Sequence, residues 1–276
     1  MPKDGELNYS RVLSEIADEA KSTQVVVMAG GLGRRMGLDV PKALIKVCGK
    51  TLLDRCIEFY LNCGFSDFVV LVGFKGDLVK KYVTEHYPWI RVGRDPFDPS
   101  VKPVGKAKAL KHALEVGVID AGRRALIVFP DDVFLDGELP VKLLMHHLQA
   151  VRLYGVWATA VFAYPAVYPF GVGEVDSRNL VTSFKEKPRV DIATSTGMYL
   201  FEERVYGLVR EVDMDADRAV EFEEVVVPRL AKEERLYAYM IPGDLWIPVN
   251  TRKDLERAER KLSSTWLRRT RAGLTP

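Results

Sequence analysis

The chain has 276 residues, a formal net charge of +2 and a 47% share of hydrophobic residues. This length can bury a full core and fits one large α/β domain or a domain with a small appendage. A near-neutral charge gives no reason to expect a nucleic acid partner. No apolar run approaches the ~20 residues of a membrane span and the polar N-terminus lacks a secretion signal, so neither membrane insertion nor export is expected.

The order of the segments predicts three regions. Residues 1–22 are expected to be an N-terminal helical extension, because apolar residues recur at helical spacing between Tyr9 and Lys21. A single α/β domain is expected over 23–262, followed by a basic tail over 263–276, which we expect to be mobile. The three cysteines show no zinc-ligand spacing. Cys56 and Cys63 lie seven residues apart on one predicted helix face and are interpreted as core residues in a reducing cytoplasm.

Within the central domain, short apolar runs alternate with amphipathic segments. Buried strands are predicted at 25–28, 68–73, 125–129 and 157–162. Helices are predicted at about 51–63, 77–87 and 103–118, with Thr51 as a cap and Gly64 as a stop, whereas the proline-containing stretch 90–102 is predicted to be irregular. This alternation with short joints is typical of a doubly wound, mostly parallel, Rossmann-like sheet flanked by helices.

The first strand ends in a glycine turn, Ala29-Gly30-Gly31-Leu32-Gly33, which Arg34, Arg35 and then Pro41-Lys42 follow. A turn without Cβ atoms brings backbone N–H groups close to a bound phosphate, and the cations neutralise its charge. No Gly-Lys-Ser/Thr closes the turn as in a P-loop, and the glycine spacing differs from a dinucleotide fingerprint. We interpret the stretch as a triphosphate pocket.

Two acids, Asp131 and Asp132, follow the third apolar strand. In open parallel sheets ligands bind beyond the carboxyl ends of the strands. Acids beside a triphosphate need an intervening cation, and oxygen ligands together with phosphates suit Mg²⁺. Either acid could instead cap the following turn, so these residues alone leave the metal ligand open.

Together these motifs resemble the sugar-phosphate nucleotidyltransferases (NDP-sugar pyrophosphorylases), such as glucose-1-phosphate thymidylyl- and uridylyltransferases and mannose-1-phosphate guanylyltransferases. The family's signature loop is Gly-Gly-x-Gly-Thr-Arg-Leu/Met followed by Pro-Lys, and Arg34 stands here where Thr is usual. The resemblance spans about 24–261. It implies Mg²⁺-dependent transfer of a nucleoside monophosphate from an NTP to a sugar-1-phosphate, giving an NDP-sugar and pyrophosphate.

The resemblance also implies which residues hold the nucleotide. Pro103-Val104-Gly105-Lys106 matches the family's Pro-x-Gly-Thr, which holds the base, although an ordinary helix start is the alternative interpretation. The residues expected to bind the nucleotide are Ala29, Gly30, Gly31, Gly33, Pro103 and Gly105, and those expected to act in catalysis are Arg35, Lys42 and Lys187. A glutamine that reads a pyrimidine in some members would fall near Ser100, so the base stays open, with pyrimidine nucleotides slightly favoured.

Two later segments resemble the family's sugar-phosphate site. Residues 168–188 are similar to Tyr-Gly-x-Val…Phe-x-Glu-Lys-Pro, and residues 193–201 are similar to Asn-Thr/Ala-Gly-Ile-Tyr-x-Phe. The residues expected to bind the sugar phosphate are Gly171, Glu186, Lys187, Ser195 and Thr196. Ser195 replaces the usual Asn, and Lys185-Glu186-Lys187 alone would be interpreted as solvated charges. The glutamates of 221–224 are expected to be solvated.

For the metal, the resemblance favours Asp131 over Asp132. The family's second metal aspartate falls at Pro248, which has no ligating side chain. Asn250 stands where the uridylyltransferases acting on N-acetylglucosamine-1-phosphate have an asparagine ligand, and it is the expected second ligand. Two alternatives stay open: a guanylyl- or cytidylyltransferase acting on a non-sugar phosphate, and a catalytically silent nucleotide-sugar-binding regulatory protein. The expected partners are an NTP and a sugar-1-phosphate, with a homo-oligomer left open.

Overall fold

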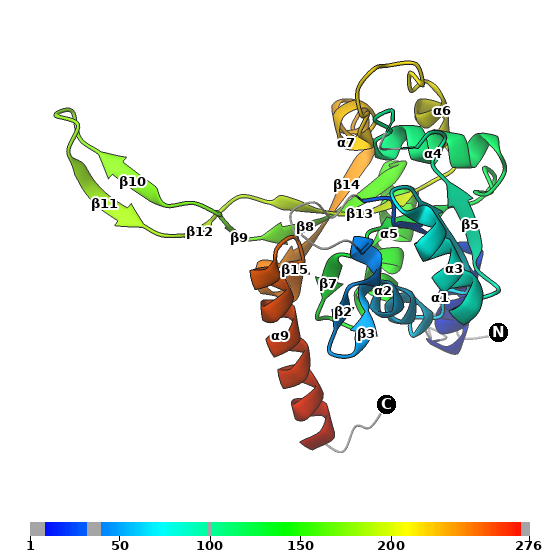
Figure 1. The fold of residues 1–276 in the computed structure, drawn as a ribbon, viewed down its shortest axis with the longest axis horizontal. Coiled ribbons are helices and arrows are strands. Elements are labelled where there is room, and N and C mark those ends of the chain that lie inside the picture. The colour runs from blue at the N-terminus through cyan, green and yellow to red at the C-terminus, as the bar shows by residue number, and fades with distance from the viewer. Residues whose placement is uncertain (1–8, 32–39, 99–100, 272–276) are drawn as a thin grey trace, which may run out of the picture.

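The computed structural model describes residues 9–31, 40–98 and 101–271. Its centre is a seven-stranded sheet in the order β14-β8-β13-β6-β1-β4-β5 (Figure 1). The bounds are β1 Gln24–Met28, β4 Asp67–Val72, β5 Arg91–Arg94, β6 Ala125–Val128, β8 Ala158–Tyr164, β13 Thr194–Phe201 and β14 Leu236–Pro242. Only β13 runs antiparallel to its neighbours in this sheet, β6 and β8. The predicted mostly parallel sheet is confirmed.

Helices cover both faces of the sheet. They are α1 Tyr9–Ser22, α2 Leu52–Leu61, α3 Gly76–His86, α4 Lys106–Glu115, α5 Leu139–Tyr154, α6 Val205–Arg210, α7 Phe222–Val225 and α8 Val227–Lys232. A further helix, α9 Arg252–Arg271, packs outside the sheet against the short strands before it, in the cluster of Ile45, Val47, Ile247 and Val249. Because successive side chains of a strand point to opposite faces, Val25 and Val27 pack in one core with α2, α3 and α5, while Val26 packs in the other with α4 and α6. None of the described helices is long and apolar enough to cross a bilayer.

The capping signals of α2 act as predicted. The Thr51 hydroxyl accepts from the Asp54 amide at 2.9 Å, and the Asp54 carboxylate accepts from the Thr51 amide at 3.0 Å. This reciprocal pair satisfies two amides that the first helical turn leaves free. Gly64, with φ of +85°, takes the left-handed conformation just beyond the end of the helix.

One sequence prediction was wrong, and two features of the structure were not predicted. The stretch predicted to be irregular contains β5, a short edge strand whose arginines hide any apolar pattern. Strand β14 was not predicted, because it alternates half-exposed residues at the opposite edge. Helix α9 continues to Arg271 and so includes 263–271 of the basic tail, while residues 272–276 lie outside the described residues. The mobility of the tail stays a prediction.

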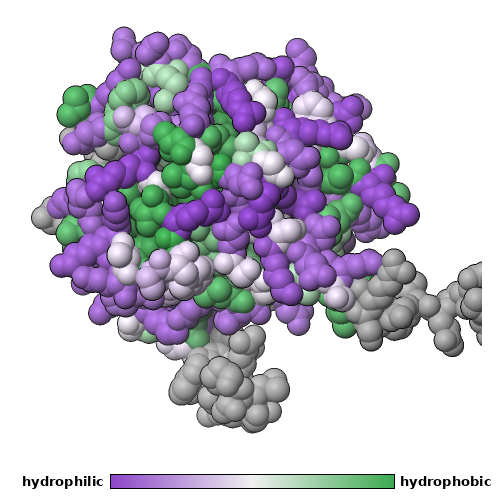
Figure 2. Space-filling model, turned by 90° about the vertical axis from the view of Figure 1, so that its right-hand side faces the viewer, coloured by the Kyte–Doolittle hydropathy of each residue, from purple (hydrophilic) through white to green (hydrophobic). Residues whose placement is uncertain are grey.

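Between β8 and β13 the chain leaves the sheet as an arm. Strand β9 (Ala166–Val167) pairs with β12 (Arg189–Val190), and β10 (Val172–Val175) pairs with β11 (Val181–Lys185). Figure 1 shows the arm projecting from the body, with β10 and β11 at its far end. Its exposed apolar side chains are Val167, Tyr168, Phe170, Val172, Val175, Leu180, Val181, Phe184 and Ile192. The opposite side of the body is mostly hydrophilic, with apolar residues gathered near the centre of the view (Figure 2).

Two small ladders complete the fold near the end of β6. Strand β7 (Asp132–Phe134) pairs antiparallel with β15 (Trp246–Pro248), and β2 (Lys46–Val47) pairs with β3 (Lys50–Thr51). Two 3₁₀ turns adjoin these ladders, η2 (Lys42–Leu44) and η3 (Gly243–Leu245). The β7–β15 ladder brings the segment before α9 against the end of the central sheet.

Candidate functional site

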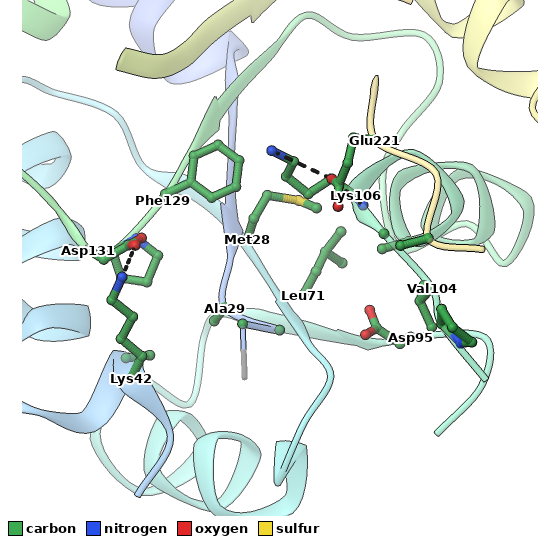
Figure 3. Close-up of a pocket in the computed structure, with 18 of the residues that line it drawn as sticks. Met28, Ala29, Lys42, Leu71, Asp95, Val104, Lys106, Phe129, Asp131 and Glu221 are labelled. Atoms are coloured by element: carbon green, nitrogen blue, oxygen red, sulfur yellow. Dashed lines mark hydrogen bonds and ion pairs between the residues drawn. The ribbon is translucent and has the colours of Figure 1, made fainter. Parts of the chain in front are cut away.

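A cavity of about 680 Å³ opens beyond the carboxyl ends of β1, β4, β5 and β6. This is where an open, doubly wound sheet binds its ligands, because the connections to the helices diverge there. Figure 3 shows Lys42 and Asp131 at one side of the cavity, Asp95 and Val104 at the other, and Ala29 between them. The predicted residues that line it are Ala29, Gly30, Gly31, Lys42, Pro103, Gly105, Asp131 and Asn250.

Lys42 lies at the centre of the polar end of the cavity, which is the end lined by Lys42, Asp131 and Asn250. Its ammonium donates to the carboxylate of Asp131 and to the amide oxygen of Asn250, the latter at 2.9 Å. The side chains of Lys42 and Asp131 are only 14% and 27% exposed, so this contact is poorly screened by water. Three residues that the sequence singled out separately therefore meet at one point.

The β7–β15 ladder explains how Asn250 reaches Asp131. Pro248 pairs with Asp132, and the Val249 amide donates to the Asp131 carbonyl at 2.8 Å. The carboxylate of Asp254 then accepts from the Asn250 amide at 3.1 Å and starts α9. The Asn250 side chain is thus fixed at the cavity, whereas Pro248 lies within the ladder.

The donor set at this end suits a magnesium ion. Asp131 and Asn250 already share one cation, the Lys42 ammonium, and both offer the hard oxygen atoms that Mg²⁺ prefers. Mg²⁺ usually takes only one or two protein ligands and completes its shell with water and substrate phosphates. The described ranges contain no group of three or more His, Cys, Asp or Glu that could hold a metal. The fit therefore depends on these two oxygens together with a phosphate ligand.

Asp132 is oriented by a different partner from its neighbour. The Trp246 indole N–H donates to the Asp132 carboxylate at 2.8 Å. Burial, reinforced by the adjacent Asp131 charge, raises the pKa of Asp132 well above its usual range. Because Asp131 contacts the lysine cation and Asp132 the indole, the geometry supports the choice of Asp131.

The other end of the cavity holds Asp95, which sequence reasoning missed. It follows β5, and its amide continues the ladder by donating to the Val72 carbonyl at 2.9 Å. A Cβ on Gly73 would collide with the Asp95 carboxylate, and one on Gly30 would lie 3.3 Å from it, so both glycines make room for this side chain. Burial raises the pKa of Asp95 to about 7. Recognising β5 as a strand would have placed this acid at a strand end.

Gly105 is required by the packing of the chain itself. Its φ is +76°, and a Cβ would lie 2.4–2.7 Å from backbone atoms of Val220. The Val220 backbone exchanges hydrogen bonds with Val104 and Ala107 on either side of this glycine. Gly105 does line the cavity, where it was predicted to contact the base. The close approach of the Val220 backbone is a second reason why this position has no side chain.

The prediction that the glutamates of 221–224 are solvated is wrong in part. Glu221 lines the cavity and accepts from the Lys106 backbone amide at 3.1 Å, at the start of α4. The Lys106 ammonium donates to Glu223 at 2.6 Å and lies 5.2 Å from the ring centre of Phe129. This paired lysine occupies the position where the family has a threonine.

The predicted sugar-phosphate residues are divided between two places. Gly171, Glu186 and Lys187 lie on the arm and are not among the residues that line the cavity. Ser195 and Thr196 lie at the start of β13, where Ser195 shares a 2.9 Å hydrogen bond with Tyr199 and Thr196 donates to the Val161 carbonyl at 3.1 Å. Gly33 and Arg35 fall in 32–39, outside the described residues.

Comparisons with known proteins identify the family of the chain. The sequence model of the family described as Nucleotidyl transferase matches residues 24–265. Glucose-1-phosphate cytidylyltransferase of Salmonella typhimurium is 27% identical over 252 residues, covering 84% of this chain and 92% of that enzyme. Mannose-1-phosphate guanyltransferase 2 of Candida glabrata is 26% identical over 238 residues, covering 83% of this chain and 62% of that enzyme.

One solved structure extends the comparison to the fold. HddC from Yersinia pseudotuberculosis, complexed with GMP-PN, has a TM-score of 0.62 at 19% identity, covering 87% of this chain and 99% of that chain. At that identity the likeness concerns the arrangement of helices and strands only.

Proposed function

The chain belongs to the nucleotidyl transferase family, and from that premise we propose that it transfers a nucleoside monophosphate from an NTP to a sugar-1-phosphate, releasing pyrophosphate. The observation that carries the proposal is the meeting of Lys42, Asp131 and Asn250 at one end of the cavity that the Gly30-Gly31 turn lines. The named relatives act on glucose-1-phosphate and mannose-1-phosphate.

The reaction needs charge neutralisation more than proton transfer. A phosphate monoester has a second pKa of about 6, so the attacking sugar phosphate is already largely dianionic at neutral pH. Of the described residues that line the cavity, none is a histidine, serine or cysteine, which agrees with a mechanism without a protein nucleophile or imidazole base. The obstacle is the approach of two polyanions, which fixed positive charge overcomes.

Each residue at the polar end then has a separate task. Lys42 holds the α-phosphate and stabilises the charge that develops as pyrophosphate departs. Asp131 and Asn250 would hold Mg²⁺, which supplies positive charge against the phosphate oxygens. The backbone amides of Gly30 and Gly31 face the triphosphate, and Arg35 is assigned to the same phosphates. We also propose that the protein acts in the cytoplasm.

Sugar-phosphate recognition is assigned to the arm and to the start of β13. Ser195 and Thr196 begin the strand that runs beside β6, and a Cβ on Gly197 would touch Phe129, which lines the cavity. Lys187 would bind the sugar phosphate once the arm and the cavity face one another, and this role stays a prediction.

The direct test is a grid of nucleoside triphosphates against sugar-1-phosphates, scored by pyrophosphate release with and without Mg²⁺. We expect turnover for at least one pair and its loss when Mg²⁺ is chelated. Tight NDP-sugar binding without turnover in any pair would favour the silent regulatory protein. Turnover with only non-sugar phosphates would move the enzyme to another substrate class.

A further inference from the structure

Asp95 is an ionisable group that the proposed chemistry does not use. It lines the cavity at the end away from Lys42, next to the apolar side chains of Leu71 and Val104 (Figure 3). Within the described part of the chain, no side-chain hydrogen bond or ion pair joins Asp95 to another residue, and burial alone shifts its pKa. A carboxylate in such a place is costly unless a ligand provides its hydrogen bonds.

The ligand group that meets Asp95 cannot be a phosphate, because two anions would repel each other in this poorly solvated place. The phosphates belong with Lys42 at the opposite end, so the nucleobase is the part of the nucleotide that extends toward Asp95. The missing side chains of Gly30 and Gly73 leave room for the Asp95 carboxylate itself, which stays at the wall of the cavity. The base therefore presents one edge to this acid.

The hydrogen-bonding edges of the bases differ in how well they match a carboxylate. An ionised carboxylate only accepts, and its two oxygens bind best to two parallel N–H donors. Guanine offers such a pair in N1–H and the 2-amino group. Uracil and thymine offer one N–H between two carbonyls, whereas cytosine and adenine offer one amino group beside a ring nitrogen that itself accepts. Guanine is the base that satisfies both oxygens of the ionised carboxylate.

We propose that Asp95 reads the N1–H and 2-amino edge of guanine and makes this enzyme a guanylyltransferase. The inference rests on the proposed function, and it replaces the slight sequence-based preference for pyrimidine nucleotides. Two donors on the ionised carboxylate also lower the pKa of Asp95 when the nucleotide binds, which reverses the effect of burial.

The test compares GTP, ITP and XTP with the wild-type chain and with Asp95→Asn. ITP lacks the 2-amino group, so we expect wild-type kcat/KM to fall roughly 10- to 150-fold from GTP to ITP, the range for a hydrogen bond to a charged group. Asparagine carries one acceptor and one donor, which match the N1–H and the 2-carbonyl of xanthine. Asp95→Asn should therefore have a lower kcat/KM for GTP and a higher kcat/KM for XTP than the wild-type chain, so that XTP becomes the better substrate of the two.

Controls separate this inference from the proposed function. Binding of GMP, IMP and XMP by calorimetry needs neither a sugar phosphate nor turnover, so it reports on base recognition even if no transferase activity appears. Asp18→Asn, which alters an exposed acid on α1, should leave the nucleotide order unchanged. Equal affinity for GMP and IMP, or an equal loss of all nucleotides in Asp95→Asn without a gain for xanthine, would overturn the assignment of Asp95.

Discussion

Asp131 and Asn250 direct their side-chain oxygens to the same atom, the ammonium nitrogen of Lys42. Lys42 and Asn250 are 208 positions apart in the sequence, and the β7–β15 ladder brings the segment of Asn250 to the Asp131 end of the cavity. A site built on one shared cation makes each of the three side chains sensitive to changes in the other two.

Replacing Asp131 by Asn should lower turnover by at least ~10²-fold, because it weakens the hold on the Mg²⁺ ion whose positive charge would face the reacting phosphates. The fold should persist, since Lys42 keeps Asn250 as a partner. Pyrophosphate release measures the loss, circular dichroism checks the fold, and Asp18→Asn serves as a matched exposed control. Near-normal turnover would remove Asp131 from the mechanism.

Asn250 and Pro248 can be distinguished as candidate metal positions. We expect Asn250→Asp to retain Mg²⁺-dependent activity and Asn250→Leu to lose it, because only the first keeps an oxygen beside Asp131. Pro248→Asp should not raise activity and should lower the melting temperature, because it places an acid opposite Asp132 in the ladder. Activity gained in Pro248→Asp would instead assign the second ligand to position 248.

Lys187 on the arm is predicted to bind the sugar phosphate. Lys187→Ala should reduce kcat/KM for the sugar-1-phosphate by ~10²-fold while leaving nucleotide binding unchanged, because the lost charge faces only that substrate. Lys185→Ala, two residues away on β11, is the matched control. Equal effects of the two variants would show a general role of charge on the arm and no specific contact.

Asp95 should make the free enzyme less stable as the pH rises. A carboxyl group whose folded pKa is about 7 binds its proton more tightly in the folded chain than in the unfolded chain, where the pKa is ~3.9. The resulting loss of stability develops between pH ~4 and ~7 and is complete above that window. Asp95→Asn should therefore raise the melting temperature at pH 8 more than at pH 5. A pH-independent difference would contradict the raised pKa.

Gly105 and Gly117 form a matched pair for a backbone test. Both have positive φ, of +76° and +73°, but a Cβ on Gly117 meets no atom within 4 Å, whereas one on Gly105 meets the Val220 backbone. Gly105→Ala should cost clearly more stability than Gly117→Ala, whose strain is ~1–3 kcal/mol, and only Gly105→Ala should raise KM for the nucleotide. Thermal unfolding and nucleotide titration of both variants provide the measurements. Equal losses of stability in the two variants would contradict the expected clash between the new side chain and the Val220 backbone.

The sequence predicted the parts of the fold that depend on local patterns. The β-branched run before the glycine turn and the Thr51 capping box are readable because burial in a parallel strand and a free helical amide each demand particular residue types. The edge strand β5 was missed, since a strand with one neighbour and polar side chains carries no apolar signal. Asp95, which follows it, was missed for the same reason.

What the sequence by itself determined is the family's set of chemical groups: the glycine turn, Lys42, and an acid after the third strand. The family resemblance already favoured Asn250 over Pro248. Only the tertiary structure gives the contact itself, because antiparallel pairing of β7 with β15 brings Asn250 to the cavity, where it shares the Lys42 cation with Asp131. It likewise placed Lys187 on a projecting arm and Asp95 inside the cavity. Contacts between distant segments depend on strand pairing and packing, which no local pattern of residues encodes.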